Sequence, residues 1–207
     1  LFYMMKSHFF EYDYVWKHTS LDLPHKYLFS AFWEGQEGSF LLWMFWHAAL
    51  GLVLLNTAKN WESKVVPVIT AVQAFLSTMI MGSYIFGMKV GSSPFTLIRH
   101  LPENIGAEWT TWPDYMVKFP AFFDGNGLNP LLQNYWMTIH PPTLCVGFAA
   151  VIVPFAFGVA GLLSKDHKGW IKPAIPWTIF GVSILGTGVL MGGAWAYEAL
   201  SFGGYWA

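Results

Sequence analysis

The stretch Gly192-Gly193-Ala194-Trp195-Ala196-Tyr197-Glu198-Ala199-Leu200-Ser201-Phe202-Gly203-Gly204-Tyr205-Trp206-Ala207 follows a long apolar run. A run of that kind is typical of a transmembrane helix, so this stretch marks where the chain meets the membrane surface. Of its five aromatic rings, three lie between two pairs of glycines and two follow the second pair. Aromatic belts are common at bilayer interfaces, whereas Gly203-Gly204 would let a large planar apolar ligand approach the backbone closely. The spacing is compatible with both interpretations.

The composition predicts an integral membrane protein. Of 207 residues, 55% are hydrophobic, 19% are aromatic and only 11% are charged, whereas soluble domains carry about a quarter charged residues. The net charge is −1 and there is no basic block, so nothing indicates a nucleic-acid partner. Cys145 lies in an apolar run and is expected to be buried and unreactive. The first residue is Leu1, not an initiator Met, and we expect an internal piece of a longer protein.

Four apolar runs predict the fold class, an all-α integral membrane protein with about four transmembrane helices and long loops on the outer side. At 1.5 Å per residue, roughly 20 apolar residues cross the hydrocarbon core. The predicted spans are 39–56, 65–88, 141–163 and 174–194. The remaining segments are the entry 1–38, the loops 57–64, 89–140 and 164–173, and the aromatic segment 195–207.

Lysines predict the orientation of these spans. The two short loops carry five lysines against Glu62 and Asp166, and the lysines are Lys59, Lys64, Lys165, Lys168 and Lys172. Because short cytoplasmic loops are enriched in Lys and Arg, loops 57–64 and 164–173 are expected on the cytoplasmic side. The three other segments then lie on the opposite, outer side.

Two histidines lie at positions where an imidazole is a candidate functional group. His140 precedes Pro141-Pro142, and we expect it just outside the third span, because a residue before proline favours extended backbone. The positive helix end disfavours imidazolium and leaves a lone pair for a metal, although a plain turn residue fits as well. His47 lies within the first span, where an ionisable group is a functional candidate, and a polar neighbour could equally satisfy it.

Four ordered blocks resemble the CcmF/NrfE/CcsA family of membrane proteins, which handle haem during cytochrome c maturation. They are Leu23-Pro24 to Trp33, the Glu37-Gly38-Ser39 entry, Leu128 to His140-Pro141-Pro142, and Trp195 to Trp206. The last block is similar to the start of the family's tryptophan-rich WWD segment, and the match is closest to the CcmF-like branch. The chain departs from the family at Glu34 and Gln36. The family has histidine at the second of these positions, and its loss argues against metal ligation there.

The resemblance implies a haem site, with b-type haem as substrate or bound cofactor. It implies that His140 is an axial ligand of the haem iron and assigns no catalytic residue in this chain. The implied apolar platform consists of Trp195, Tyr197, Phe202, Tyr205 and Trp206, with Gly203 and Gly204 admitting the macrocycle. A second outer histidine and the histidines of an intramembrane haem would lie beyond residue 207.

The resemblance also implies a function, namely presentation of haem on the periplasmic face of the bacterial plasma (inner) membrane for thioether attachment to apocytochrome c. The intact protein would be a component of a cytochrome c haem lyase. Implied partners are apocytochrome c, haem delivery and other cytochrome c maturation proteins, and the lipid bilayer. Two alternatives stay open: a non-catalytic membrane scaffold, and a transporter or respiratory subunit with an interfacial aromatic belt.

Overall fold

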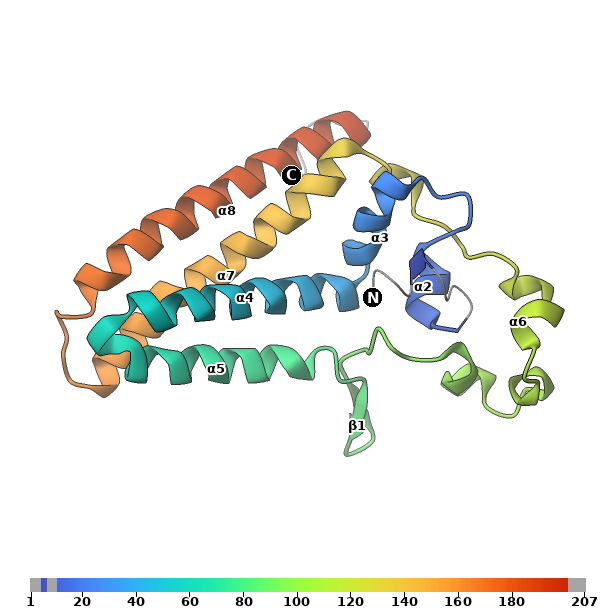
Figure 1. The fold of residues 1–207 in the computed structure, drawn as a ribbon, viewed down its shortest axis with the longest axis horizontal. Helices are drawn as coiled ribbons and strands as arrows, with labels where there is room; N and C mark the ends of the chain where they lie inside the picture. The colour runs from blue at the N-terminus through green and yellow to red at the C-terminus, as the bar shows by residue number, and fades with distance from the viewer. Residues whose placement is uncertain (1–4, 7–10, 201–207) are drawn as a thin grey trace.

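Four long helices form the body of the protein in the computed structural model, which describes residues 5–6 and 11–200. They are α4 (Gln36–Thr57), α5 (Glu62–Thr78), α7 (Tyr135–Leu163) and α8 (Ile171–Ala199). Helix α7 packs against each of the other three and is the centre of the bundle (Figure 1). At one end of the bundle, Leu54 of α4, Val65 of α5 and Phe157 of α7 form a shared core.

Short elements complete the chain. The helices are α2 (Asp13–His18), α3 (Leu28–Glu34) and α6 (Tyr115–Lys118), and the strands are β1 (Ser83–Ile85) and β2 (Met88–Val90). Single turns of 3-10 helix occur at His25–Tyr27, Lys59–Trp61, Ile98–His100, Pro102–Asn104, Glu108–Thr111, Pro120–Phe122 and Pro130–Leu132. The described part of the chain is therefore mostly helical, with one antiparallel hairpin.

Three helices in the described part of the chain are long and apolar enough to cross a membrane, namely α4, α7 and α8. The predicted span over 65–88 is too long, because α5 ends at Thr78 after 17 residues. A two-residue turn at Phe86 and Gly87, both with positive φ, folds the following residues into the β1–β2 hairpin. Glycine at the second turn position permits that backbone. The turn was not predicted, because the residues around it are apolar and continue the hydropathy of the helix.

Small residues let α7 and α8 approach closely, as is usual between helices in lipid. A Cβ atom on Gly147 of α7 would lie 2.8 Å from Cα of Leu185 on α8. A Cβ atom on Gly188 of α8 would lie 2.8 Å from a methyl group of Leu144. Gly188 of α8 and Gly147 of α7 therefore permit the close packing of these two helices. Cys145, on the same helix, is buried as expected.

Gly147→Ala is expected to destabilise the protein, because the new methyl group meets backbone that cannot move without separating α7 from α8. Overpacking of this kind typically costs about 1–3 kcal/mol. The matched control is Gly186→Ala, since a Cβ atom there meets nothing within 4 Å. Thermal unfolding of the two variants in detergent measures the difference, and equal melting temperatures would contradict the close contact.

Residues 11–35 and 91–134, here called the loop region, fold together at the end of the bundle where α7 begins (Figure 1). Two backbone hydrogen bonds pair them, Asp13 to Thr96 and Ile98 to Glu11, each 3.0 Å long. One buried cluster joins Tyr14 and Val15 of α2 to Leu128. The two segments are thus one folded unit that lies beside the first turns of α7.

Candidate functional site

His140 lies inside α7, in its second turn, and the expectation that it stands outside the helix is wrong. The helix begins early because the side chain of Asn134 caps it, accepting a hydrogen bond of 2.8 Å from the N–H of Trp136. Pro141 cannot donate to the carbonyl of Met137, but the indole Nε1 of Trp33 donates to that oxygen at 3.0 Å. This contact replaces the missing helical hydrogen bond, so the backbone before the proline stays helical.

Asn134 is the residue that sequence reasoning missed. Asn is among the strongest N-cap residues, and its position before an aromatic and apolar run was the available signal. The helix was instead predicted to begin at Pro141, because proline is common at the first helical position. With the cap at Asn134, the helix begins at Tyr135 and not at residue 141, so His140 lies within α7.

The imidazole of His140 is held in one tautomer by α8. Its Nδ1 lies 2.7 Å from the carbonyl oxygen of Gly188. A carbonyl only accepts, so Nδ1 carries the proton and donates, and Nε2 keeps an unprotonated lone pair. A backbone carbonyl on one ring nitrogen is the usual arrangement that orients a metal-binding histidine. The residue types and their contacts therefore fit an axial ligand for haem iron.

Gly192 leaves room for this ring. A Cβ atom on Gly192 would lie 2.6 Å from Cε1 of His140 and 3.1 Å from its Nε2. The first distance is shorter than real Cβ contacts and the second is at their tight end, so a side chain at position 192 would push the imidazole out of this position. The glycines predicted to admit a planar ligand were Gly203 and Gly204, which lie outside the described residues, and the role of Gly192 beside the histidine was not predicted.

Of the predicted platform residues, the structure describes two. Trp195 follows Gly192 by about one helical turn, and its Nε1 donates to the carbonyl of Leu131 at 3.2 Å, which ties the end of α8 to the loop region. Tyr197 is 73% exposed and is rotated by about 140° around α8 from Gly192. Phe202, Gly203, Gly204, Tyr205 and Trp206 lie outside the described residues.

The structure therefore brings His140 and Trp195 to the same end of the α7–α8 pair and turns Tyr197 to another side of α8. Within residues 5–6 and 11–200, no group of three or more His, Cys, Asp or Glu side chains is placed to hold a metal ion. His140 is thus considered as a single imidazole ligand.

His47 on α4 is buried, with only 2% of its surface exposed. Its Nδ1 lies 2.8 Å from Oε1 of Gln73 on α5, and the amide nitrogen of Gln73 donates to the carbonyl of Met44 at 3.4 Å. This orientation of the amide makes Nδ1 the protonated nitrogen. Nε2 is buried without a partner in the described part of the chain. Gln73 is thus the polar neighbour that sequence analysis allowed for, although it satisfies only one ring nitrogen.

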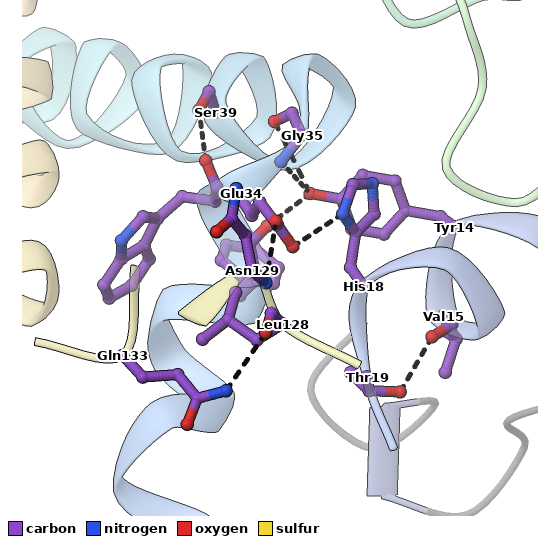
Figure 2. Close-up of polar contacts among 12 residues, drawn as sticks. Tyr14, Val15, His18, Thr19, Glu34, Gly35, Ser39, Leu128, Asn129 and Gln133 are labelled. Atoms are coloured by element: carbon purple, nitrogen blue, oxygen red, sulfur yellow. Dashed lines mark hydrogen bonds and ion pairs between the residues drawn. The ribbon is translucent and has the colours of Figure 1, made fainter. Parts of the chain in front are cut away.

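Glu34, one of the two departures from the family sequence, connects the two segments of the loop region to each other. Its Oε2 lies 2.7 Å from Nδ1 of His18 on α2, and its Oε1 accepts from the N–H of Asn129 at 3.5 Å. Figure 2 shows these contacts converging beside Tyr14 and Gly35. The carboxylate therefore has a structural role, joining α2 to α3 and to the segment that leads into α7.

The Glu-Gly-Ser entry is a tight junction between α3 and α4. A Cβ atom on Gly38 would overlap the carbonyl oxygen of Phe32. The hydroxyl of Tyr14 donates to that same oxygen at 2.9 Å and accepts from the N–H of Gly35 at 3.1 Å. Burial raises the pKa of Tyr14 above its ordinary value, so the hydroxyl stays protonated and can donate.

Tyr14→Phe is expected to destabilise the protein by about 1–2 kcal/mol, because a buried donor and acceptor lose their partner. Tyr84→Phe on the exposed hairpin is the control, since its side chain is 62% exposed. Thermal unfolding in detergent compares the two. A melting temperature for Tyr14→Phe equal to that of Tyr84→Phe would show that the junction does not depend on this hydroxyl.

Comparison with known proteins identifies the family. Residues 33–207 match the model of the family described as cytochrome C assembly protein. The chain is 35% identical to cytochrome c-type biogenesis protein CcmF of Pseudomonas fluorescens and 30% identical to that of Haemophilus influenzae. Each match covers 100% of this chain and 28% of the relative.

The CcmF protein of Escherichia coli is 31% identical over 95% of the chain, which corresponds to 27% of that relative. No solved structure matches the chain. The family model covers most of the sequence, and the relatives agree with it over nearly the full length of the chain. The chain therefore belongs to the cytochrome C assembly protein family.

Proposed function

We propose that this chain forms the haem-holding part of a cytochrome c maturation protein, with Nε2 of His140 as an axial ligand of the iron. The observation that carries the proposal is the hydrogen bond of 2.7 Å from Nδ1 to the carbonyl of Gly188, which presents an unprotonated Nε2. Its relatives are named cytochrome c-type biogenesis proteins, which supports the same process.

The position of His140 along the bundle supports presentation of haem at one surface. His140 lies near the start of α7 and Trp195 near the end of α8, so the antiparallel pair brings both to one end. The five lysines of the short loops lie at the other end. By the bias of cytoplasmic loops toward lysine, the histidine end faces the periplasm of a bacterial inner membrane.

In this proposal haem is the substrate, delivered by other maturation proteins and joined to apocytochrome c. The two cysteine thiols of an apocytochrome Cys-x-x-Cys-His motif add across the haem vinyl groups, each S–H supplying a sulfur to one carbon and a proton to its neighbour. His140 would hold and orient the macrocycle, and Trp195 with the aromatic residues of 202–206 would provide the apolar surface. Correct positioning of two reactants is worth about 7–11 kcal/mol in the best intramolecular cases.

The rest of the chain supports that geometry. Trp33 satisfies the carbonyl freed by Pro141, and α8 supplies both the carbonyl that orients the imidazole and the glycine that makes space for it. An axial imidazole also tunes the iron potential. Release of product requires the histidine of the cytochrome to replace one axial ligand, so ligation by His140 is expected to be moderate in strength.

Cytochrome c maturation in cells tests the proposal. In a strain that lacks the full-length protein, His140→Ala is expected to lower the amount of haem-stained c-type cytochrome at least tenfold. His100→Ala is the matched control, because His100 lies exposed in the loop region. Both variants are quantified in membranes first. Full cytochrome production with His140→Ala at wild-type protein levels would refute the assignment and favour a scaffold that needs no haem.

A further inference from the structure

A cavity of about 620 Å³ lies at the lysine-rich end of the bundle, far from His140 along α7 and α8. The turn between α4 and α5 forms one side of it and the start of α8 forms the other. Its lining includes the polar side chains of Lys59, Asn60 and Lys172 and the rings of Trp61, Phe157 and Trp177. The cavity thus combines cationic groups with an apolar wall.

The charge in this cavity is positive and uncompensated. Lys59 and Lys172 line the cavity. A third lysine is close by, because Nζ of Lys64 lies 4.9 Å from the ring centroid of Trp61, which forms part of the cavity wall. None of the described residues that line it is acidic. The ion pairs in residues 5–6 and 11–200 involve Lys17, His18 and Lys118 and leave these three lysines without a carboxylate.

The start of α8 adds to this field. Helix N-termini carry partial positive charge, so acidic side chains usually occupy the first turn. The first turn of α8 contains Lys172 and no acidic residue, and the N-cap residue, Trp170, makes no side-chain capping hydrogen bond. A lysine at this end is unfavourable by itself. An anion between Lys172 and Lys59 would convert the unfavourable charge arrangement into a favourable one.

The surroundings of the cavity are those of a lipid, not of a soluble anion. Trp61 and Trp177 are residues that prefer the boundary between hydrocarbon and water. Beyond the cavity, Phe180 continues the face of α8 that Pro176 and Trp177 begin, and with its neighbour Ile179 it forms an exposed apolar strip, with 41% and 63% of their surfaces accessible. A phosphate held by the lysines would leave its acyl chains in position to lie on this strip.

We propose that this cavity binds an anionic phospholipid of the bilayer, with its phosphate between Lys59 and Lys172 and its acyl chains along α8. The occupant is a lipid because the wall is mainly aromatic and aliphatic, and because α4 and α8 are both long and apolar enough to cross a membrane. The site lies at the opposite end of the bundle from His140 and is independent of haem binding.

Native mass spectrometry of the full-length protein in detergent tests the proposal. The protein is titrated with palmitoyl-oleoyl phosphatidylglycerol, which is anionic, and separately with the zwitterionic phosphatidylcholine of the same chains. The wild type is expected to bind the anionic lipid more tightly. Each lysine near a phosphate contributes about fivefold in affinity, so Lys59→Gln/Lys172→Gln is expected to weaken phosphatidylglycerol binding about 25-fold. Binding of phosphatidylcholine should stay unchanged.

The matched control is Lys165→Gln/Lys168→Gln, which removes the same charge from the neighbouring short loop without touching the cavity lining. This control is expected to keep the affinity of the wild type. An equal loss in both double variants would overturn the proposal, because the effect would then come from general charge. Equal binding of the two lipids by the wild type would overturn it as well.

A competition on the wild type alone keeps the test valid if a variant fails to fold. Soluble glycerol phosphate is added to protein loaded with phosphatidylglycerol. Retention of the lipid supports the proposal, because the acyl chains then contribute to binding. Displacement at equal concentration would show that the site selects a free phosphate group and would overturn the assignment of a lipid.

Discussion

Gly192→Ala is expected to disrupt haem binding without touching a ligand atom. The new Cβ atom would lie 2.6 Å from Cε1 of His140, so the ring must leave its place and give up the hydrogen bond to Gly188. Loss of an orienting contact behind a metal-binding histidine typically lowers metal affinity about 10–100-fold. We therefore expect haem occupancy of the full-length protein to fall by at least an order of magnitude, measured as haem per protein after purification.

Gly186→Ala is the control for this experiment. It adds the same methyl group to the same helix, at a position with nothing within 4 Å. Haem occupancy in Gly186→Ala should match the wild type. If Gly192→Ala retained as much haem as Gly186→Ala, the ring of His140 could not be seated against α8 in the haem-bound protein.

Gln73→Leu is expected to destabilise the α4–α5 pair by about 1–3 kcal/mol. His47 is 2% exposed and its Nε2 has no partner in the described residues, so removal of Gln73 leaves both ring nitrogens unsatisfied. A buried polar group without its partner costs about this much. Thermal unfolding in detergent measures the loss, with Thr70→Val, an exposed substitution one turn earlier on α5, as the control.

The stability and haem binding of the double variant His47→Leu/Gln73→Leu show whether the two side chains have a structural or a functional role. Replacement of both partners by apolar groups is often nearly neutral, so its stability should return most of the way to that of the wild type. If the stability lost in the double variant equalled the sum of the losses in His47→Leu and Gln73→Leu, the two side chains would not act as a pair. Haem binding should stay intact in the double variant, because the hydrogen bonds of His47 and Gln73 join α4 to α5 and do not involve His140.

Hydropathy predicted much of the fold, because long apolar runs are what a membrane requires of a spanning helix. The runs around α4, α7 and α8 were long enough to identify as spans, and each forms a helix. The end of α5 was missed because apolar residues continue past Thr78 into the hairpin. There the backbone turn at Phe86 and Gly87 decides the structure, and hydropathy does not report on it.

The candidate site was predictable as a residue type but not as a geometry. His140 was identified from its place before two prolines and from the family resemblance. Its tautomer depends on Gly188, 48 positions away, and the helix that carries it depends on the indole of Trp33. Contacts between residues so distant in sequence arise from packing of the bundle, and no local pattern encodes them.

Contacts between distant residues also decide the structure of the loop region. Glu34 is one of the two positions where the chain departs from the family, and the sequence alone offered no reason for the difference. Its carboxylate pairs with His18 and with the N–H of Asn129, from two segments that are separated by most of the loop region. The substitution has a structural explanation that appears only once α2, α3 and the start of α7 are folded together.

The visible absorption spectrum of the purified full-length protein tests the central claim most directly, compared between wild type and His140→Ala after expression with ample haem. The wild type is expected to show haem bands, and His140→Ala is expected to lose or shift them while its thermal unfolding and detergent elution stay unchanged. Identical haem spectra in the two proteins would remove His140 from the site and contradict the account.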